Sequence, residues 1–208
     1  MLIGSYNKTV LITYIGIILS IVGMVQAIKG AIQYSLICLI AAGICDLFDG
    51  RFAAIFKRNE YEKSFGVEID SLGDMINFAA FPIVLFYMAG LNAWWHIPLF
   101  GFYSLAAITR LAHFNVMAKT ASETERPSFF QGLPVTYSAL IFPLVWLISS
   151  WLMPDLRDML CSLAFLCVGV LFVLDVKIPK PRGAAYIFFA VLAVLVSYFI
   201  LTFRGAVS

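Results

Sequence analysis

Seven apolar runs follow one another along this chain of 208 residues, each long enough to form a membrane-spanning helix. A helix rises about 1.5 Å per residue, so about 20 residues cross a hydrocarbon core of about 30 Å. The mean hydropathy of +0.94 and the 12% of charged residues are typical of membrane proteins. We therefore predict an all-α fold, a polytopic membrane helical bundle of about seven transmembrane helices, forming one domain over 1–208. The predicted spans are 9–28, 31–56, 66–90, 94–117, 133–152, 158–175 and 184–203.

The lysine and arginine residues fall mostly on one side of these spans. With Met1 on the cytoplasmic side, ten of them lie in inside segments, three lie in outside segments, and Arg110 falls within the fourth span. An excess of positive charge marks the cytoplasmic side of a membrane protein. We predict a multi-pass protein of the cell membrane in which residues 49–70 face the cytoplasm. The inside residues are Lys8, Arg51, Lys57, Arg58, Lys63, Lys119, Arg126, Lys177, Lys180 and Arg182, and the outside residues are Lys29, Arg157 and Arg204.

Four aspartates lie in the most polar stretch of the chain, within or at the ends of the second and third runs. They form two pairs, Asp46 with Asp49 and Asp70 with Asp74. A carboxylate at the centre of a membrane helix costs about 2.5–3.5 kcal/mol on insertion scales, so acids within a membrane indicate a function. Four such groups would be strongly destabilising without a positive charge between them.

Small residues accompany both pairs of acids. Because residues three and four apart share a helix face, each pair lies in one stripe with its small neighbours. Two facing stripes would form a cage of carboxylate oxygens suited to Mg²⁺ or Mn²⁺. Two such ions would hold a pyrophosphate and stabilise an in-line displacement. The first stripe is Asp46, Asp49, Gly50 and Ala53, and the second is Gly66, Asp70, Gly73 and Asp74.

Two other interpretations of the acids are open. They could pair at the membrane surface with basic neighbours such as Arg51 and Lys63, but such pairing does not require four acids in two stripes beside glycines. They could also line the path of a divalent-cation transporter, a class that commonly has an inverted repeat around a midplane site. The sequence has no visible repeat and its acids lie towards the cytoplasmic end, so we favour a metal-dependent enzyme.

The two stripes resemble the signature of the CDP-alcohol phosphotransferases, D-x2-D-G-x2-A-R-x8-G-x3-D-x3-D. Seven of its eight residues are present, and the signature arginine is replaced by Ala54. The segment before Gly66 is also three residues longer than the usual eight. In the family that arginine helps to hold the CDP-lipid, so we expect Lys57, Arg58 or Lys63 to supply the charge.

The resemblance extends to the bacterial phosphatidylserine synthase branch of this family. The runs Asp70–Pro82, Arg110–Asn115 and Phe130–Pro134 are similar to the D-S-L-x-D-x-x-S-F-x-x-x-P, R-L-A-R-F-N and F-x-G-L-P segments of that branch. Asn77 stands where the branch has a serine, and His113 where it has an arginine. The family's N-terminal P-N-x-x-T survives mainly as Thr13.

The resemblance implies a function and a set of site residues. A phosphatidyl group would pass from CDP-diacylglycerol to serine, with release of CMP, at a site that binds two Mg²⁺ or Mn²⁺ ions. Asp74 would also be the catalytic residue that takes the proton of the acceptor hydroxyl. The metal ligands would be Asp46, Asp49, Asp70 and Asp74; the CDP-lipid contacts Thr13, Asp49, Gly50, Ala53, Lys63, Ser64 and Gly66; and the acceptor or phosphate contacts Asn77, Arg110 and Asn115.

The implied partners are CDP-diacylglycerol, a small alcohol (L-serine first), membrane lipids and a second copy in a homodimer, with no nucleic acid. Another alcohol is the alternative within the same reaction class: glycerol phosphate, inositol phosphate, choline or a sugar alcohol. The differences at Asn77 and His113 bear on that choice, because changes at these positions could alter the acceptor.

Overall fold

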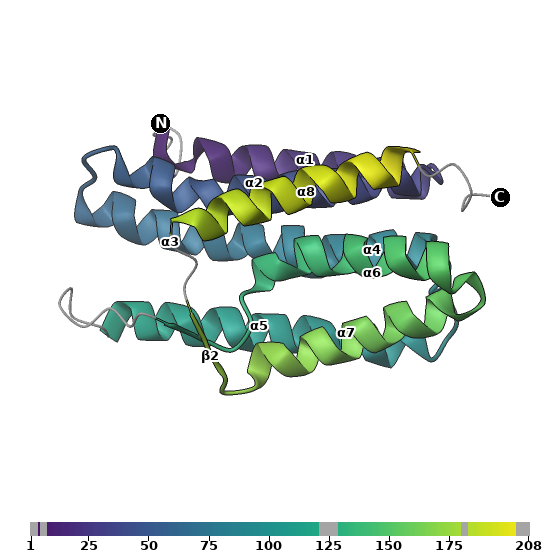
Figure 1. The fold of residues 1–208 in the computed structure, drawn as a ribbon. Helices are drawn as coiled ribbons and strands as arrows, with labels where there is room; N and C mark the ends of the chain where they lie inside the picture. The colour runs from purple at the N-terminus through teal and green to yellow at the C-terminus, as the bar shows by residue number, and fades with distance from the viewer. Residues whose placement is uncertain (1–3, 5–7, 121–128, 180–182, 203–208) are drawn as a thin grey trace.

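The computed structural model describes residues 4, 8–120, 129–179 and 183–202 and shows the predicted helical bundle (Figure 1). The long helices run side by side, and the connection between α2 and α3 lies at the same end of the bundle as the start of α1. The α-helices are α1 (Leu11–Ile28), α2 (Ile32–Ala54), α3 (Glu60–Asp74), α4 (Phe81–Met88), α5 (His96–Thr120), α6 (Ser138–Leu152), α7 (Arg157–Val173) and α8 (Ala184–Thr202). Short helical turns are η1 (Lys8–Val10), η2 (Met75–Ala80), η4 (Val135–Tyr137) and η5 (Pro154–Leu156).

Among the described residues, six helical segments are long and apolar enough to cross a membrane, so the chain is a multi-pass membrane protein. One of them, Glu60–Met88, is a continuous rod made of α3, η2 and α4. The second predicted span corresponds to α2, which is not one of the six and has three charged residues within its last ten. Four of the basic residues used to predict the orientation lie outside the described residues: Arg126, Lys180, Arg182 and Arg204.

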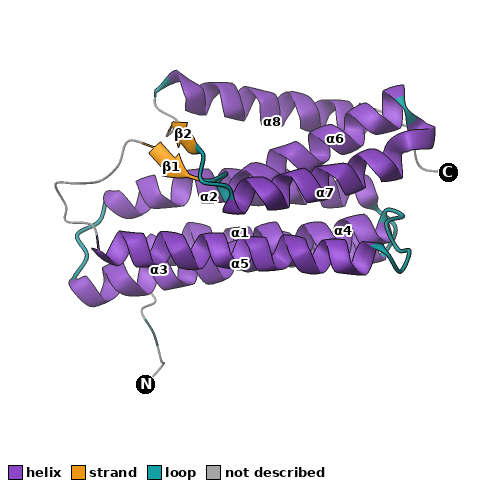
Figure 2. Cartoon of the chain, turned by 90° about the horizontal axis from the view of Figure 1, so that it is seen from below, coloured by secondary structure: helices purple, strands orange, loops and turns teal. Residues whose placement is uncertain are grey.

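The bundle also contains two short strands that the all-α prediction did not include. β1 (Phe129–Gln131) pairs antiparallel with β2 (Lys177–Pro179), with Phe130 opposite Ile178 (Figure 2). The ammonium of Lys177 lies 4.9 Å from the centre of the Phe129 ring. The pair joins the segment before α6 to the segment before α8. Three residues per strand are too few for an alternating pattern to be visible in the sequence.

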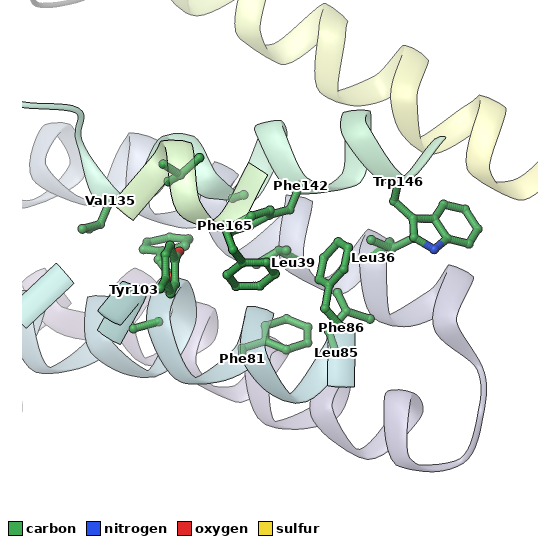
Figure 3. Close-up of a cluster of buried hydrophobic side chains, with 14 of the residues drawn as sticks. Leu36, Leu39, Phe81, Leu85, Phe86, Tyr103, Val135, Phe142, Trp146 and Phe165 are labelled. Atoms are coloured by element: carbon green, nitrogen blue, oxygen red, sulfur yellow. The ribbon is translucent and has the colours of Figure 1, made fainter. Parts of the chain in front are cut away.

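Aromatic side chains fill the centre of the bundle (Figure 3). Phe142 of α6 and Phe165 of α7 stack with ring centres 4.3 Å apart, and Tyr103 of α5 packs edge-on against Phe165 at 5.0 Å. All three side chains are fully buried. Aromatic pairs at these separations contribute about 0.5–1.5 kcal/mol each beyond the area they bury. This cluster holds α5, α6 and α7 together.

A π-helical turn, η2, interrupts the rod immediately after Asp74. The amide of Phe81 donates to the carbonyl of Ile76, five residues back, where an α-helix would use the residue four back. The carbonyl of Phe78 would normally accept from the amide of residue 82, but Pro82 has none. The hydroxyl of Tyr103 donates to that carbonyl instead. One buried tyrosine therefore bonds a backbone carbonyl of the rod where its hydrogen-bond pattern changes.

Gly43 permits a close approach between α2 and α6. A Cβ atom on Gly43 would lie 2.6 Å from the Cβ of Ala139, well inside contact distance. We expect Gly43→Ala to lower the free energy of unfolding by about 1–3 kcal/mol, because the helices must separate. Gly101→Ala is the matched control: that site has open space and should gain up to about 1 kcal/mol. Thermal unfolding in detergent measures both, and equal stability of the two variants would contradict the close approach.

Candidate functional site

The four aspartates come together between the end of α2 and the end of α3. Carboxylate oxygens of Asp46, Asp49 and Asp70 all lie within 4.8 Å of one another. The carboxyl group of Asp74 contacts that of Asp46, and the carboxyl group of Asp70 contacts that of Asp49. The two stripes predicted from the sequence therefore face each other. The structure brings together the four acids that the spacing singled out.

Two threonines from distant parts of the chain hold this cluster. The hydroxyl of Thr13, in α1, donates to Oδ2 of Asp49 at 3.1 Å. The hydroxyl of Thr136, in the turn before α6, donates to Oδ2 of Asp46. Thr13 was predicted as a lipid contact, and here it orients a carboxylate. Thr136 was not predicted, because a threonine two residues after Pro134 has no local pattern that connects it to α2.

The acids repel one another at this separation. Two carboxylate charges 4.8 Å apart repel by about 3–4 kcal/mol at an effective dielectric constant of about 20. Arg110 of α5 is buried, and its charge acts on Asp74 and Asp46. One arginine cannot balance four carboxylates, so the charges favour a bound cation.

The donor set fits a hard divalent cation. All the donor atoms are carboxylate oxygens, which Mg²⁺ and Mn²⁺ prefer. Opposite oxygens on one Mg²⁺ at about 2.1 Å lie about 4 Å apart, so oxygens within 4.8 Å of one another need only a small shift to share an ion. Asp46, Asp49 and Asp70 are therefore the residues placed to hold an ion together, and Asp74 borders them through Asp46.

The three predicted acceptor or phosphate contacts lie close to the acids along the chain or in space. Asn77 is buried one turn after Asp74, and its Oδ1 has no hydrogen-bond partner in the described part of the chain. The same is true of the buried Nε of Arg110. Asn115 is less available to a ligand, because its Oδ1 accepts a hydrogen bond from the hydroxyl of Ser71 at 2.9 Å.

The remaining predicted contacts differ in how far they are exposed. Gly50 has open space where a side chain would be, whereas Ala53 is buried. Ser64 is exposed. The ammonium of Lys63 forms an ion pair with the exposed Glu60 at 2.8 Å.

The position of Arg58 bears on the missing signature arginine. Its guanidinium lies 3.6 Å from where a Cβ atom of Gly66 would stand, one turn before Asp70 on α3. Of the three basic residues proposed to replace the arginine at Ala54, Arg58 is thus shown to lie close to a residue of the second stripe.

An apolar cavity of about 320 Å³ opens beside the acids, between α2, α6 and α8. Asp46 and Thr136 form part of its wall, next to side chains such as Leu140 and Phe189. Tyr186 of α8 also lines the cavity, and the guanidinium of Arg51 stacks over its ring at 3.6 Å. The cavity therefore joins an apolar space to the acidic cluster.

Comparison with known proteins places the chain in a family. The family model for CDP-alcohol phosphatidyltransferase matches residues 7–168. The chain belongs to this family. The match includes α1 to α6 and most of α7, and so all four aspartates, Thr13, Arg110 and Thr136.

Curated relatives of this CDP-alcohol phosphatidyltransferase carry serine in their names. The CDP-diacylglycerol–serine O-phosphatidyltransferases of Mycobacterium tuberculosis and Saccharomyces cerevisiae are each 31% identical to it, over 59% and 56% of this chain and 44% and 43% of theirs. The archaetidylserine synthase of Methanothermobacter thermautotrophicus is 28% identical over 82% of this chain and 65% of its own length. The matched regions thus span less than half of the M. tuberculosis and yeast relatives.

The threonine contact to Asp46 supports a prediction about metal binding. We expect Thr136→Val to weaken Mn²⁺ binding about 10- to 100-fold, because residues that orient metal ligands have effects of this size. Thr136→Ser keeps the hydroxyl and should stay close to the unaltered protein. Mn²⁺ titration followed by electron paramagnetic resonance measures both. Equal affinities for the valine and serine variants would show that the hydroxyl does not support the site.

Proposed function

We propose that this protein transfers a phosphatidyl group from CDP-diacylglycerol to L-serine, forming phosphatidylserine and releasing CMP. The observation that carries the proposal is the convergence of Asp46, Asp49 and Asp70 within 4.8 Å, beside an apolar cavity that reaches Asp46. A site with both properties suits a lipid that carries a pyrophosphate. Membership of the CDP-alcohol phosphatidyltransferase family supports the reaction class.

The acids would hold two Mg²⁺ or Mn²⁺ ions, with Asp46, Asp49, Asp70 and Asp74 as ligands. When bound, the ions would neutralise the pyrophosphate of the CDP-lipid and the charge that develops on the departing CMP. Thr13 and Thr136 would keep two of the carboxylates in the orientation that this requires. Gly50 and Ala53 would leave room for the cytidine, and the space beside Gly50 is open.

Asp74 would accept the proton of the serine hydroxyl as its oxygen attacks the phosphorus that bears the diacylglycerol. The new bond joins that oxygen to phosphorus, and the bond between this phosphorus and the oxygen of CMP breaks. Asp74 contacts Asp46 but lies outside the tight group of three acids, so one of its oxygens can face the acceptor. This division of roles suits a general base, which must be within hydrogen-bond reach of the proton.

Arg110 and Asn77 would receive the polar groups of serine. The guanidinium of Arg110 suits the carboxylate of serine or a phosphate oxygen, and its buried Nε has no partner among the described residues. Asn77 lies one turn after Asp74 with an unpartnered acceptor atom, which suits the ammonium of serine. Buried polar groups without partners are costly, so a ligand that satisfies both gains affinity.

The apolar cavity would take part of the diacylglycerol. At about 320 Å³ it accommodates a segment of an acyl chain or the glycerol end of the lipid. The relatives include both phosphatidylserine and archaetidylserine synthases by name, so serine is common to them while the lipid backbone differs. We further propose that the site faces the cytoplasm in the cell membrane and that the protein is a homodimer.

One assay tests the proposed function. Purified protein receives CDP-diacylglycerol, Mg²⁺ or Mn²⁺, and one alcohol at a time from a panel of serine, glycerol phosphate, inositol phosphate and choline, and CMP release is measured. Release with serine supports the proposal. CMP release only with another alcohol would show that this alcohol, and not serine, is the acceptor. Ion flux into vesicles without CMP release would indicate a transporter.

The position of Arg58 beside Gly66 of α3 predicts which basic residue replaces the signature arginine. We expect Arg58→Ala to raise the KM for CDP-diacylglycerol about 10-fold, because a charge-assisted contact to phosphate contributes about 1.5–3 kcal/mol. Lys63→Ala is the matched control and should change this KM less, because its ammonium already pairs with Glu60. A larger effect of Lys63→Ala would assign the role to Lys63.

A further inference from the structure

Helix α5 contacts the rod of α3 and η2 at three successive levels. The hydroxyl of Tyr103 donates to the carbonyl of Phe78, the charge of Arg110 acts on Asp74, and Asn115 accepts from Ser71. The residue numbers rise along α5 as they fall along the rod, so the two elements run antiparallel. Tyr103 and Arg110 are seven residues apart and share one face of α5. The two hydrogen-bonded levels thus lie on either side of the level of Arg110, whose charge acts on Asp74.

We propose that Tyr103 and the pair Ser71–Asn115 are positioning residues that fix α5 against α3, so that Arg110 is presented to Asp74 and to the acceptor. The kinetic part of this inference rests on the proposed function. It assigns Asn115 a role through Ser71 rather than through direct contact with the substrate. It also gives a role to Tyr103, which no sequence motif indicates.

The Tyr103 contact is well suited to hold a fixed register. Its acceptor is a backbone carbonyl that has no helical donor at residue 82, because that residue is Pro82. Tyr103 is fully buried among Phe142, Phe165 and Phe172, so water cannot replace its hydroxyl (Figure 3). If α5 slid or rotated, this buried hydrogen bond would be lost, which is disfavoured.

Arg110 depends on such support. Its Nε makes no hydrogen bond within the described part of the chain, and its guanidinium lies 5.5 Å from the ring centre of Phe114, on its own helix. A long side chain that is not anchored at Nε takes its direction largely from the helix that carries it. The position of α5 therefore decides where the guanidinium lies relative to Asp74.

A cross-linking experiment tests the register without using activity. Ser71→Cys and Asn115→Cys are introduced together, and a short bifunctional thiol reagent links them; the linked peptides are quantified by mass spectrometry. We expect Tyr103→Phe, added to this pair, to slow cross-linking about fivefold, because losing one buried hydrogen bond shifts a conformational equilibrium by about that factor. An unchanged rate would overturn the proposal. Phe142→Leu, which alters the same aromatic cluster but keeps the hydroxyl, should leave the rate unchanged.

A kinetic experiment tests the consequence for Arg110. We expect Tyr103→Phe and Ser71→Ala each to raise the KM for serine and to lower kcat. In each variant the two changes should lower kcat/KM by about 10- to 100-fold, because misplacing a binding group has effects of this size. The KM for CDP-diacylglycerol should stay within about twofold, and Ser71→Thr should restore activity because it keeps the hydroxyl. Loss of thermal stability with unchanged KM values would show a structural role only and would overturn the inference. If the unaltered protein releases no CMP with any alcohol, the proposed function fails, while the cross-linking result still decides the register.

Discussion

Replacing Asp74 with asparagine should abolish turnover while leaving the CDP-lipid bound. The amide keeps the shape of the side chain but cannot accept the proton of the acceptor hydroxyl, and loss of a general base costs about 10²- to 10⁴-fold in rate. Asp74 lies outside the group of three acids that share the 4.8 Å cluster, so ion binding should depend on it less. CMP release measures turnover, and binding of CDP-diacylglycerol to the purified variant is measured separately.

The matched control for this variant is Asp175→Asn, an exposed acid between α7 and β2. It makes the same chemical change far from the cluster in sequence and should leave both CMP release and lipid binding unchanged. Equal loss of turnover and lipid binding in Asp74→Asn would show that Asp74 only holds metal. Residual turnover close to that of the unaltered protein would remove it from the proton transfer.

Removal of divalent cations should inactivate the protein, and Asp70→Ala should have a similarly large effect. Asp70 is one of the three acids whose oxygens converge, and it is the one that α3 contributes to that group. A metal ion stabilises the charge of a phosphoryl-transfer transition state by several kcal/mol, which corresponds to about 10³-fold or more in rate. Chelation followed by CMP release measures the first effect, and CMP release by the variant measures the second.

Adding metal ions back separates a requirement for metal from damage to the fold. Added Mg²⁺ or Mn²⁺ should return full activity to the chelated protein, whereas Asp70→Ala should stay inactive at any concentration of either ion. Added Mn²⁺ should raise the thermal unfolding temperature of the variant less than that of the unaltered protein, because ligand binding stabilises the folded state. Activity that survives complete chelation would contradict a metal-dependent reaction.

The family and the general fold could be predicted from the sequence because they depend on local patterns. Apolar runs of membrane-spanning length predicted the helices, and six segments of the structure have that character. The spacing of Asp46, Asp49, Asp70 and Asp74 predicted two acidic stripes, since helix geometry decides which residues share a face. The structure brings these stripes together, and the family model confirms the resemblance of the signature. The roles of the individual residues stay predictions.

Tertiary structure decided the features that join distant segments. Thr136 reaches Asp46 across 90 positions, Ser71 reaches Asn115 across 44, and Tyr103 reaches the carbonyl of Phe78 across 25. No periodicity in a single segment encodes such contacts, because each depends on how two helices are rotated and shifted against each other. The strand pair and the cavity between α2, α6 and α8 arise in the same way. The sequence by itself therefore determined which carboxylates share a helix face, through local helix geometry, while packing between helices decided that the two stripes meet and which side chains hold them in place.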